Sequence, residues 1–514
     1  MRRGPPWRTT PRGTTQELQE RAIPDPASVP PDNGNILQDV TPDRARRVHL
    51  LGVAGTGMGS FAGMLKAVGH TVTGSDLNVY PPMSDMLAAW GIEVMTPYRP
   101  ENLDAARPDL VVVGNVIRRV NPEATAVRER GLPAMSFPAA FGSLFLRGRH
   151  SVVVAGTHGK TTTSALVAHL LVTAGLDPSF LVGGVTGNNG ANFRVGKGNQ
   201  VVVEGDEYDT AYFDKGPKFL HYQPRTAIFT SMELDHADIY RDEAHYASAF
   251  ARFVALLPPD GLLAVSAAWP AAVALARQSR SPVITYAVDS RHPAEVQAHG
   301  IRHGPDGVRF QLVDRGRPLG EIHLAVPGLH NVENALGAWA AISPLGVDVG
   351  AFAEGCRTFL GVRRRQEVRG EVNGVLVVDD FAHHPTAVRE TIQALRGRWP
   401  DRRLWAVFEP RSNTSRRKLH QTAYAEAFDG AGRVSLKTPE KHDQVPDGEE
   451  LDIGRLISDL RARGLETDAA SDVPSLVAQV VAGARPGDVI LGMSNGSFGG
   501  FHSAVLAGLQ GRNR

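Results

Sequence analysis

The sequence predicts an α/β fold divided among about three domains. Its 514 residues exceed what one hydrophobic core usually organises, and ~150 residues per domain gives about three units. Strand-like apolar segments alternate with helix-like segments, which is typical of a parallel sheet with crossover helices. Several strand-like segments end in a glycine turn or in polar residues, and ligands of open α/β sheets collect at such strand ends.

The composition excludes several classes of protein. With 42% hydrophobic and 21% charged residues, the chain resembles ordinary soluble globular proteins. Its 55 basic residues against 54 acidic ones give no electrostatic reason to expect nucleic acid or an anionic membrane surface as a partner. The single cysteine, Cys356, rules out an internal disulfide and is typical of a reducing cytoplasm. No apolar run approaches the ~20 residues of a membrane span, so we expect a cytoplasmic protein without membrane contact.

Residues 1–47 differ from the rest of the chain. They are rich in proline and arginine and hold few large apolar residues. They also lack the apolar stretch of a secretory signal. We expect a disordered, solvated tail, with ordered structure beginning at Val48.

The first domain, residues 48–148, is predicted to bind a phosphate-bearing ligand. Its first strand, VHLLGV, is followed by a turn and helix that begin with Gly55, Thr56, Gly57 and Met58. Glycines there permit a tight turn and close backbone approach to a phosphate. Ser60 replaces the third glycine of the G-x-G-x-x-G pattern, so a turn without a ligand is an open alternative. Later strands end at Asp76, near the distance expected for a ribose contact, and at Asn115.

The second domain, residues 149–327, carries the strongest signal, the run SVVVAGTHGKTTT at 151–163. A strand, a glycine turn, a Lys-Thr pair and a helix follow one another here, and this order is used to hold a nucleotide triphosphate. Val154 stands at the first glycine of the full motif, and a plain strand-to-helix turn is the alternative. We expect an ATP site made by Gly156, Thr157, His158, Gly159, Lys160, Thr161 and Thr162.

Two further strand ends in this domain predict a magnesium site. VVVEGDEYD places Glu204 at the end of a buried strand, and TAIFTSMELDHADIY places His236 after another. Mg²⁺ takes oxygen ligands and is usually held by few protein groups plus phosphates. Thr161 and Glu204 meet that description, and His236 either ligates directly or holds a bound water. No cysteine lies nearby, which argues against zinc at His236.

The third domain, residues 328–514, contributes polar residues from several strand and helix ends. Asn331 and Asn334 open a helix and could read a base or a ribose, and one of Arg363, Arg364 and Arg365 is a candidate phosphate clamp. Other candidates end successive strands: Asp380, His383 and His384; Arg411, Ser412, Asn413 and Thr414; Ser494 and Asn495. A guanidinium such as that of Arg411 could take a carboxylate bidentately.

The ordered motifs GTHGKTTT, EGDEYD, LDHAD, GLHNVENAL, RRRQE and DDFAHHPT resemble those of the Mur ligase family, the ATP-dependent amide-forming enzymes of peptidoglycan synthesis. The resemblance implies a Rossmann-like UDP-sugar-binding domain, a central P-loop ATPase and a Rossmann-like C-terminal domain. It also implies ATP and Mg²⁺ as cofactors. By this resemblance, Lys160 and Thr161 hold phosphates and Mg²⁺, and Glu204 and His236 complete the metal site. Asn331 and Asn334 are implied to bind the nucleotide. Arg365 is implied to bind phosphate, and Asp380 to contact ATP. No lysine follows between Ala237 and Asp260, so the carbamylated lysine of some relatives is not expected.

Four segments indicate the branch of the family. SDLNVYPPMS (75–84), EYDTAYFDK (207–215), EPRSNT (409–414) and MSNGSFGG (493–500) are similar to those of the branch that joins UDP-N-acetylmuramate to L-alanyl-γ-D-glutamyl-meso-diaminopimelate. The implied partners are these two substrates, in a monomer or weak dimer. L-Alanine is the alternative acceptor. The implied UDP-sugar site is Gly55, Thr56, Gly57, Met58, Asp76 and Asn115, and the implied tripeptide site is Arg411, Ser412, Asn413, Thr414, Ser494 and Asn495.

The implied catalytic set is Lys160, His236, Arg365 and His383. His383 or His384 is the candidate base for the incoming amine. Two other readings of the chain are an NAD-dependent oxidoreductase built on the first domain and a non-catalytic sensor of cell-wall nucleotides.

Overall fold

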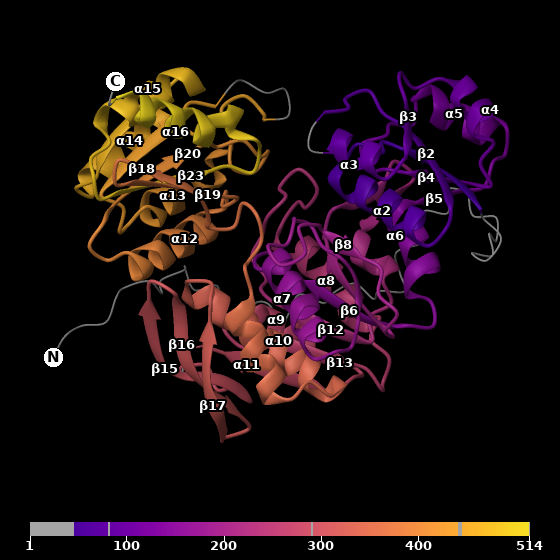
Figure 1. Ribbon diagram of the computed structural model, residues 1–514, viewed down its shortest axis with the longest axis horizontal. Helices are drawn as coiled ribbons and strands as arrows, with labels where there is room; N and C mark the ends of the chain where they lie inside the picture. The colour runs from indigo at the N-terminus through magenta and orange to yellow at the C-terminus, as the bar shows by residue number, and fades with distance from the viewer. Residues whose placement is uncertain (1–45, 81–82, 289–290, 440–444, 513–514) are drawn as a thin grey trace.

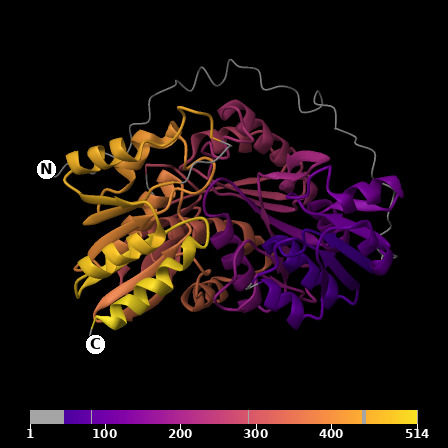
Figure 2. The ribbon, with the colours of Figure 1, turned by 90° about the horizontal axis from the view of Figure 1, so that it is seen from above.

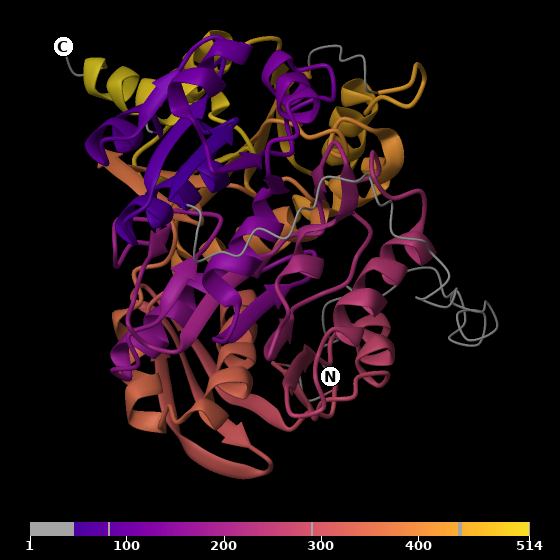
Figure 3. The same ribbon diagram turned by 90° about the vertical axis from the view of Figure 1, so that its right-hand side faces the viewer.

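The computed structural model describes residues 46–80, 83–288, 291–439 and 445–512, which form three α/β bodies (Figure 1). The predicted disordered tail lies outside these residues except for Arg46 and Arg47, and Arg47 already begins the first strand. The N-terminal and C-terminal bodies lie on the same side of the central body, and the view from above places them at opposite ends (Figures 2 and 3). No helix among the described residues is long and apolar enough to cross a membrane.

The N-terminal body is a five-stranded, all-parallel sheet in the order β3-β2-β1-β4-β5. Its strands are β1 (Arg47–Leu51), β2 (Thr71–Ser75), β3 (Glu93–Met95), β4 (Leu110–Val113) and β5 (Ala134–Ser136), and its helices are α2 (Thr56–Ala67), α3 (Met83–Ala89), α4 (Pro100–Ala106), α5 (Pro122–Glu129), α6 (Phe137–Phe141) and the π-helical turn η3 (Gly142–Leu146). The strand order reverses between β1 and β4, so the glycine turn after β1 lies at the switch point, where α/β sheets bind ligands.

The central body contains a ten-stranded sheet in the order β17-β16-β15-β14-β13-β12-β6-β9-β7-β8. Its strands are β6 (His150–Ala155), β7 (Ser179–Leu181), β8 (Phe193–Arg194), β9 (Gln200–Gly205), β12 (Thr226–Phe229), β13 (Leu262–Ser266), β14 (Val283–Ala287), β15 (Val296–Gly304), β16 (Gly307–Asp314) and β17 (Arg317–Leu324). The five strands from β14 to β9 run parallel, and β6 lies between β12 and β9. The polar ends of β12, β6 and β9 therefore meet at one edge of the sheet.

Helices cover both faces of this sheet, and a small hairpin stands beside it. The helices are α7 (Lys160–Thr173), α8 (Glu243–Ala255), α9 (Pro270–Ala276), α10 (Leu329–Ile342) and α11 (Val349–Thr358), with the 3-10 turns η4 (Lys218–His221) and η5 (Ser343–Leu345); the hairpin is β10 (Asp209–Ala211) with β11 (Asp214–Pro217). At the hairpin tip, Arg128 of α5 donates to the Tyr212 hydroxyl at 3.1 Å. The hairpin therefore links the central and N-terminal bodies.

The predicted domain boundary at residue 328 falls in front of α10, but α10 and α11 belong to the central body. Their buried apolar side chains, from Val332 to Cys356, share one core with β6 and α7, and this core continues to Val362. Sequence patterns place a helix correctly but do not say which sheet it covers. We therefore propose a boundary near Val362 instead of residue 328.

The C-terminal body is a six-stranded sheet in the order β18-β19-β23-β20-β21-β22, in which only β18 is antiparallel. Its strands are β18 (Glu367–Val372), β19 (Val375–Asp380), β20 (Arg403–Phe408), β21 (Arg433–Lys437), β22 (Glu466–Ala470) and β23 (Asp488–Met493), and its helices are α12 (Pro385–Arg398), α13 (Gln421–Ala427), α14 (Ile453–Ala462), α15 (Val473–Gly483) and α16 (Phe501–Gly511), with the 3-10 turns η6 (Lys418–His420) and η7 (Phe498–Gly500). Separate apolar cores lie on the two faces of the sheet.

The N-terminal and central bodies share a continuous apolar core. Phe141 of α6 is fully buried at their junction, with its ring centroid 6.1 Å from that of Phe61 on α2 and 5.8 Å from that of Tyr222 in the central body. The apolar cores of the C-terminal body are separate from those of the central body, and polar contacts span their junction, as where Arg398 of α12 donates to the Pro305 carbonyl at 3.1 Å. The C-terminal body is therefore the less firmly attached of the two.

Candidate active site

A cavity of about 1160 Å³ lies where the three bodies meet. Its wall includes Thr56 of the N-terminal body, Lys160 and Asn334 of the central body, and Asp380 of the C-terminal body. Most residues predicted for the ATP, metal and catalytic sites line this cavity: Thr157, His158, Gly159, Lys160, Thr161, Thr162, Glu204, His236, Asn331, Asn334, Arg365, Asp380 and His383. Those predicted for the UDP-sugar and tripeptide sites, Thr56 excepted, lie outside its wall.

Glycine makes the turn between β6 and α7 possible. Gly156 and Gly159 have φ of +135° and +80°, in the region that favours glycine. A Cβ on Gly159 would lie 2.6 Å from Asn334 Oδ1, so the loop backbone also needs the missing side chain to approach α10. Helix α7 then begins at Lys160, and its free N–H groups and dipole favour an anion in front of it.

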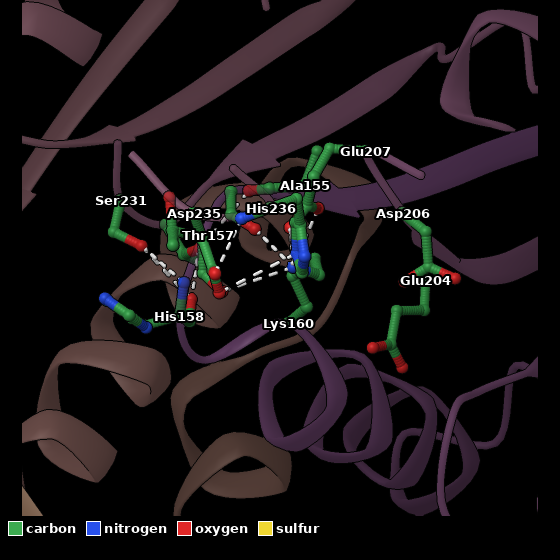
Figure 4. Close-up of polar contacts among 12 residues, drawn as sticks. Ala155, Thr157, His158, Lys160, Glu204, Asp206, Glu207, Ser231, Asp235 and His236 are labelled. Carbon is green, nitrogen blue, oxygen red and sulfur yellow. Dashed lines mark hydrogen bonds and ion pairs between the residues drawn. The ribbon is translucent and has the colours of Figure 1, made fainter. Parts of the chain in front are cut away.

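Lys160 is buried within this loop and held by three groups (Figure 4). Its Nζ donates to the carbonyl oxygens of Gly156 at 2.6 Å and Thr157 at 3.2 Å, and it pairs with Glu207 Oε2 at 2.8 Å. Burial opposes the charged ammonium, but the carboxylates of Glu207, Asp206 and Glu204 outweigh that effect and raise the pKa of Lys160. The ammonium is therefore kept charged beside the N-terminal end of α7.

Thr161 and Glu204 form an oxygen-lined pair suited to a divalent cation. The Thr161 hydroxyl donates to Glu204 Oε1 at 2.7 Å, and Gly183 N donates to Glu204 Oε2 at 2.6 Å. A Cβ on Gly183 would lie 2.7 Å from Glu204 Oε2, so glycine leaves this carboxylate room. Burial and the Asp206 carboxylate raise the pKa of Glu204, so they disfavour its charged form. A bound cation would stabilise that charged form. The two oxygen ligands fit Mg²⁺.

His236 faces Glu207, a residue that the sequence analysis did not select. His236 Nε2 lies 3.0 Å from Glu207 Oε1, and its ring packs against Tyr208 with centroids 4.2 Å apart and the ring planes tilted by 48°. Burial opposes protonation, but Asp235 and Glu207 raise the pKa of His236. Glu207 is almost fully buried and is shared by Lys160 and His236. The motif EGDEYD contained it, but only the fold shows which carboxylate turns inward.

Residues from the start of α10 and from the C-terminal body close the other side of the site. Asn331 donates to the Pro327 carbonyl at 2.6 Å, and Asn334 donates to Asn331 Oδ1 at 3.2 Å. Of the three consecutive arginines, Arg365 reaches the ATP loop, with Nη2 3.4 Å from Thr161 Oγ1. Asp380 accepts from Ala382 N at 2.7 Å, and burial raises its pKa.

Arg364 turns instead toward the end of β23, where it donates to the Ser494 carbonyl at 2.8 Å. The three arginines therefore do not act as one charged surface.

The two histidines that follow β19 have different surroundings. His383 Nδ1 lies 3.1 Å from the Phe381 carbonyl, which can only accept, so Nδ1 carries the proton and Nε2 is free. That Nε2 lies 3.9 Å from Asp235 Oδ2. Burial lowers the pKa of both rings, and for His384, where His158 adds to the effect, to about 3. His383 thus presents a neutral nitrogen to a carboxylate that would stabilise its protonated form.

The residues predicted for the tripeptide site gather on the C-terminal body. A Cβ on Gly496 would lie 1.3 Å from Arg411 Nη1, so the guanidinium rests directly on that glycine. Ser494 donates to Glu409 Oε2 at 2.6 Å, and Asn413 donates to Asp238 Oδ2 of the central body at 3.0 Å. Thr414 and Ser494 are buried. This cluster therefore sits beside the loop that carries His236.

Some of the residues predicted for the UDP-sugar site stabilise the fold of the N-terminal body and do not face a ligand site. Asp76 Oδ2 accepts from Ala54 N at 2.9 Å, and Oδ1 accepts from Leu77 N at 2.7 Å, so this carboxylate holds the glycine turn. The Met58 side chain is buried in the core, and only its backbone could meet a ligand. Gly55 and Thr56 open α2, and Asn115 is exposed just after β4. Met58 lies on the inner face of α2 and packs in the core. The glycine-turn pattern in the sequence did not show that its side chain points inward.

Family models cover nearly all of the described chain. The model of the Mur ligase family catalytic domain matches residues 47–149, that of the Mur ligase middle domain matches 154–342, and that of the Mur ligase glutamate ligase domain matches 364–496.

Individual relatives match over the same length. UDP-N-acetylmuramate–L-alanyl-γ-D-glutamyl-meso-2,6-diaminoheptandioate ligase of Escherichia coli (strain K12) is 39% identical over 469 residues, covering 90% of this chain and 98% of the relative. UDP-N-acetylmuramate–L-alanine ligase of Desulfosudis oleivorans is 36% identical over 385 residues, covering 75% of this chain and 81% of the relative. The crystal structure of a murein peptide ligase from Psychrobacter arcticus has a TM-score of 0.67 at 35% identity, covering 90% of this chain and 98% of that one.

We predict that Lys160→Ala abolishes ATP turnover and leaves the fold intact. Its ammonium supplies charge where phosphoryl oxygens would lie, and loss of such a contact costs ~10²-fold or more in rate. Steady-state turnover should be compared with Lys197→Ala, which removes an exposed lysine of the same body. Near-normal turnover by a folded Lys160→Ala variant would contradict the assignment of the ATP loop.

We also predict that Glu207→Gln moves the alkaline limb of the turnover profile to lower pH. The Glu207 charge raises the pKa of Lys160 while burial lowers it, so without that charge the ammonium deprotonates earlier as pH rises. The measurement is kcat/KM against pH, with Glu129→Gln at an exposed position as the control. An unmoved alkaline limb would show that Glu207 does not set the charge of Lys160.

Proposed function

The chain belongs to the Mur ligase family, and on that premise we propose that it joins L-alanyl-γ-D-glutamyl-meso-diaminopimelate to UDP-N-acetylmuramate, with conversion of ATP to ADP and phosphate. The observation that carries this function is the match along 90% of the chain to a relative named for these substrates. Such a ligase returns a murein peptide to peptidoglycan precursors. We place it in the cytoplasm, where ATP is available.

The reaction we propose has two steps. In the first, a lactyl carboxylate oxygen of UDP-N-acetylmuramate attacks the γ-phosphorus of ATP, the bond to ADP breaks, and an acyl phosphate forms. In the second, the amine of the tripeptide attacks the acyl carbon, the nitrogen loses one proton, and phosphate leaves as the amide forms. Binding and orientation of three reactants in one cleft would account for much of the rate.

The residues of the cleft suit the first step. Lys160 and Arg365 approach the start of α7 from different bodies and would neutralise the charge of the transferring phosphoryl group. Thr161 and Glu204 would hold Mg²⁺, with His236 next to them or acting through water. Mg²⁺, when bound, supplies positive charge to the phosphate oxygens. Asn331, Asn334 and Asp380 would position the nucleoside.

The second step needs a group that accepts the proton of the amine. His383 is our candidate, because its Nε2 has a free lone pair and faces Asp235. Burial keeps the ring neutral near pH 7, which is the form a base requires. His384 is the less accessible of the two, with a side chain 3% exposed against 19% for His383, so it is the weaker candidate.

L-Alanine is the alternative acceptor, since a UDP-N-acetylmuramate–L-alanine ligase is also a relative. The cluster of Arg411, Asn413 and Ser494 favours the larger acceptor, because a fork of guanidinium donors suits the carboxylate at the far end of diaminopimelate. An NAD-dependent oxidoreductase would use Asp76 to bind a ribose of the dinucleotide. Here the Asp76 carboxylate accepts from the backbone of its own turn, which gives that alternative no support. A non-catalytic sensor would not need the charged residues Lys160, Glu204 and Arg365 together, so the proposed ATP site favours an enzyme.

We predict that only the tripeptide, among L-alanine, L-alanyl-D-glutamate and the tripeptide, supports rapid ATP-dependent release of phosphate. The assay supplies UDP-N-acetylmuramate and Mg²⁺ with each acceptor in turn, and mass spectrometry identifies the product. Omission of UDP-N-acetylmuramate is the control for uncoupled hydrolysis. Equal or faster turnover with L-alanine would overturn the tripeptide assignment.

We predict that Arg411→Lys raises the KM for the tripeptide by ~10-fold or more, because a lysine cannot reproduce the two-pronged contact with a carboxylate. The KM values for ATP and UDP-N-acetylmuramate should move little, since those ligands contact mainly the other two bodies. Arg416→Lys, on the same loop, serves as the matched substitution. Equal changes in all three KM values would refute a specific role for Arg411 in binding the acceptor.

A further inference from the structure

A second group of metal-ligating side chains lies beside the ATP loop and uses none of the residues assigned to Mg²⁺. His158, Glu233 and His384 each direct one ligand atom into a space where these atoms lie within 4.8 Å of one another. His158 Nε2 is 2.8 Å from Glu233 Oε2, and His384 Nδ1 is 3.6 Å from the same oxygen. His158 belongs to the turn before α7, Glu233 follows β12, and His384 is the N-cap of α12. The group therefore joins the central and C-terminal bodies.

The group offers the donors that a transition metal binds. Two imidazoles and one carboxylate come together from three different loops and helix ends. A carboxylate in its ionised form and imidazoles in their neutral form are ordinary metal ligands.

His384 supplies Nδ1 to this group from a buried position. The residue is 4% exposed, and its Nδ1 receives one long bond of 3.3 Å from Thr386 N. The same nitrogen lies 3.6 Å from Glu233 Oε2, so Nδ1 is the atom that would meet a cation, in place of that long bond.

We propose that His158, Glu233 and His384 form a transition-metal site, suited to Zn²⁺ and separate from the Mg²⁺ site at Thr161 and Glu204. Two imidazoles and one carboxylate are a common zinc set, whereas Mg²⁺ prefers oxygen ligands. Because one ligand comes from the C-terminal body, a bound ion fastens that body to the ATP loop. The site does not depend on which acceptor the enzyme uses.

The test is calorimetric titration of the untagged, full-length chain with Zn²⁺ in an excess of Mg²⁺. We expect one tightly bound equivalent. Glu233→Gln and His384→Asn each remove a direct ligand, so each should weaken zinc binding by at least ~100-fold. Loss of a residue that only supports a ligand already costs up to about that much. Asparagine can keep the N-cap bond of His384, so α12 should stay intact, and thermal melting without metal checks this.

Two control variants separate this site from its neighbours. Glu204→Gln alters the oxygen-lined pair, and His420→Ala removes a ring that packs on His384, with centroids 4.6 Å apart, without belonging to the ligand group. Both variants should bind zinc with an affinity within ~10-fold of the wild type, because loss of a residue that is not a ligand costs about that much at the lower end.

Thermal melting supplies a second readout. Zn²⁺ should raise the melting temperature of the wild type and of both controls, because a ligand that binds the folded state stabilises it. It should not do so for Glu233→Gln or His384→Asn. Absence of binding to the wild type, binding that survives both ligand substitutions, or binding lost in Glu204→Gln would each overturn the proposal.

Discussion

The buried pairing of Lys160 with Glu207 is the interaction on which the rest of the site depends. An ammonium and a carboxylate taken out of water are tolerated only when they are paired and hydrogen-bonded. The two loop carbonyls and His236 complete that requirement, and in doing so they tie together the ends of β6, β9 and β12. The loop before α7, the turn after β9 that carries Glu207 and the loop after β12 therefore hold one another in position.

Much of the molecule follows from local patterns, and the exceptions have a common cause. The strand, turn and helix around Lys160 depend on neighbours in the chain, so periodicity and glycine spacing predict them. The partner of His236, the burial of Met58 and the packing of α10 on the central sheet depend on residues distant in sequence. The motif that contains Glu207 was visible, but this residue lies in the turn between β9 and β10, and its inward orientation depends on Lys160 and His236, which are distant in sequence.

The site is shared between bodies that are attached with unequal firmness. A continuous apolar core joins the N-terminal and central bodies, while polar contacts carry much of the junction to the C-terminal body. Arg365 reaches the Thr161 hydroxyl across that junction, so the proposed phosphate site is complete only when the C-terminal body is docked. Interfaces of this kind permit relative domain motion, which would let substrates enter before the cleft closes.

The contact between Arg411 and Gly496 has a consequence for attempts to change the acceptor. The proposed acceptor site depends partly on the absence of a side chain at position 496, because a Cβ there would lie 1.3 Å from Arg411 Nη1 and displace the guanidinium. A library that varies Arg411 alone would leave an empty hollow above the glycine for smaller replacements. Variation of both positions together lets a new side chain at 496 fill that hollow, so the two codons form a single unit for redesign.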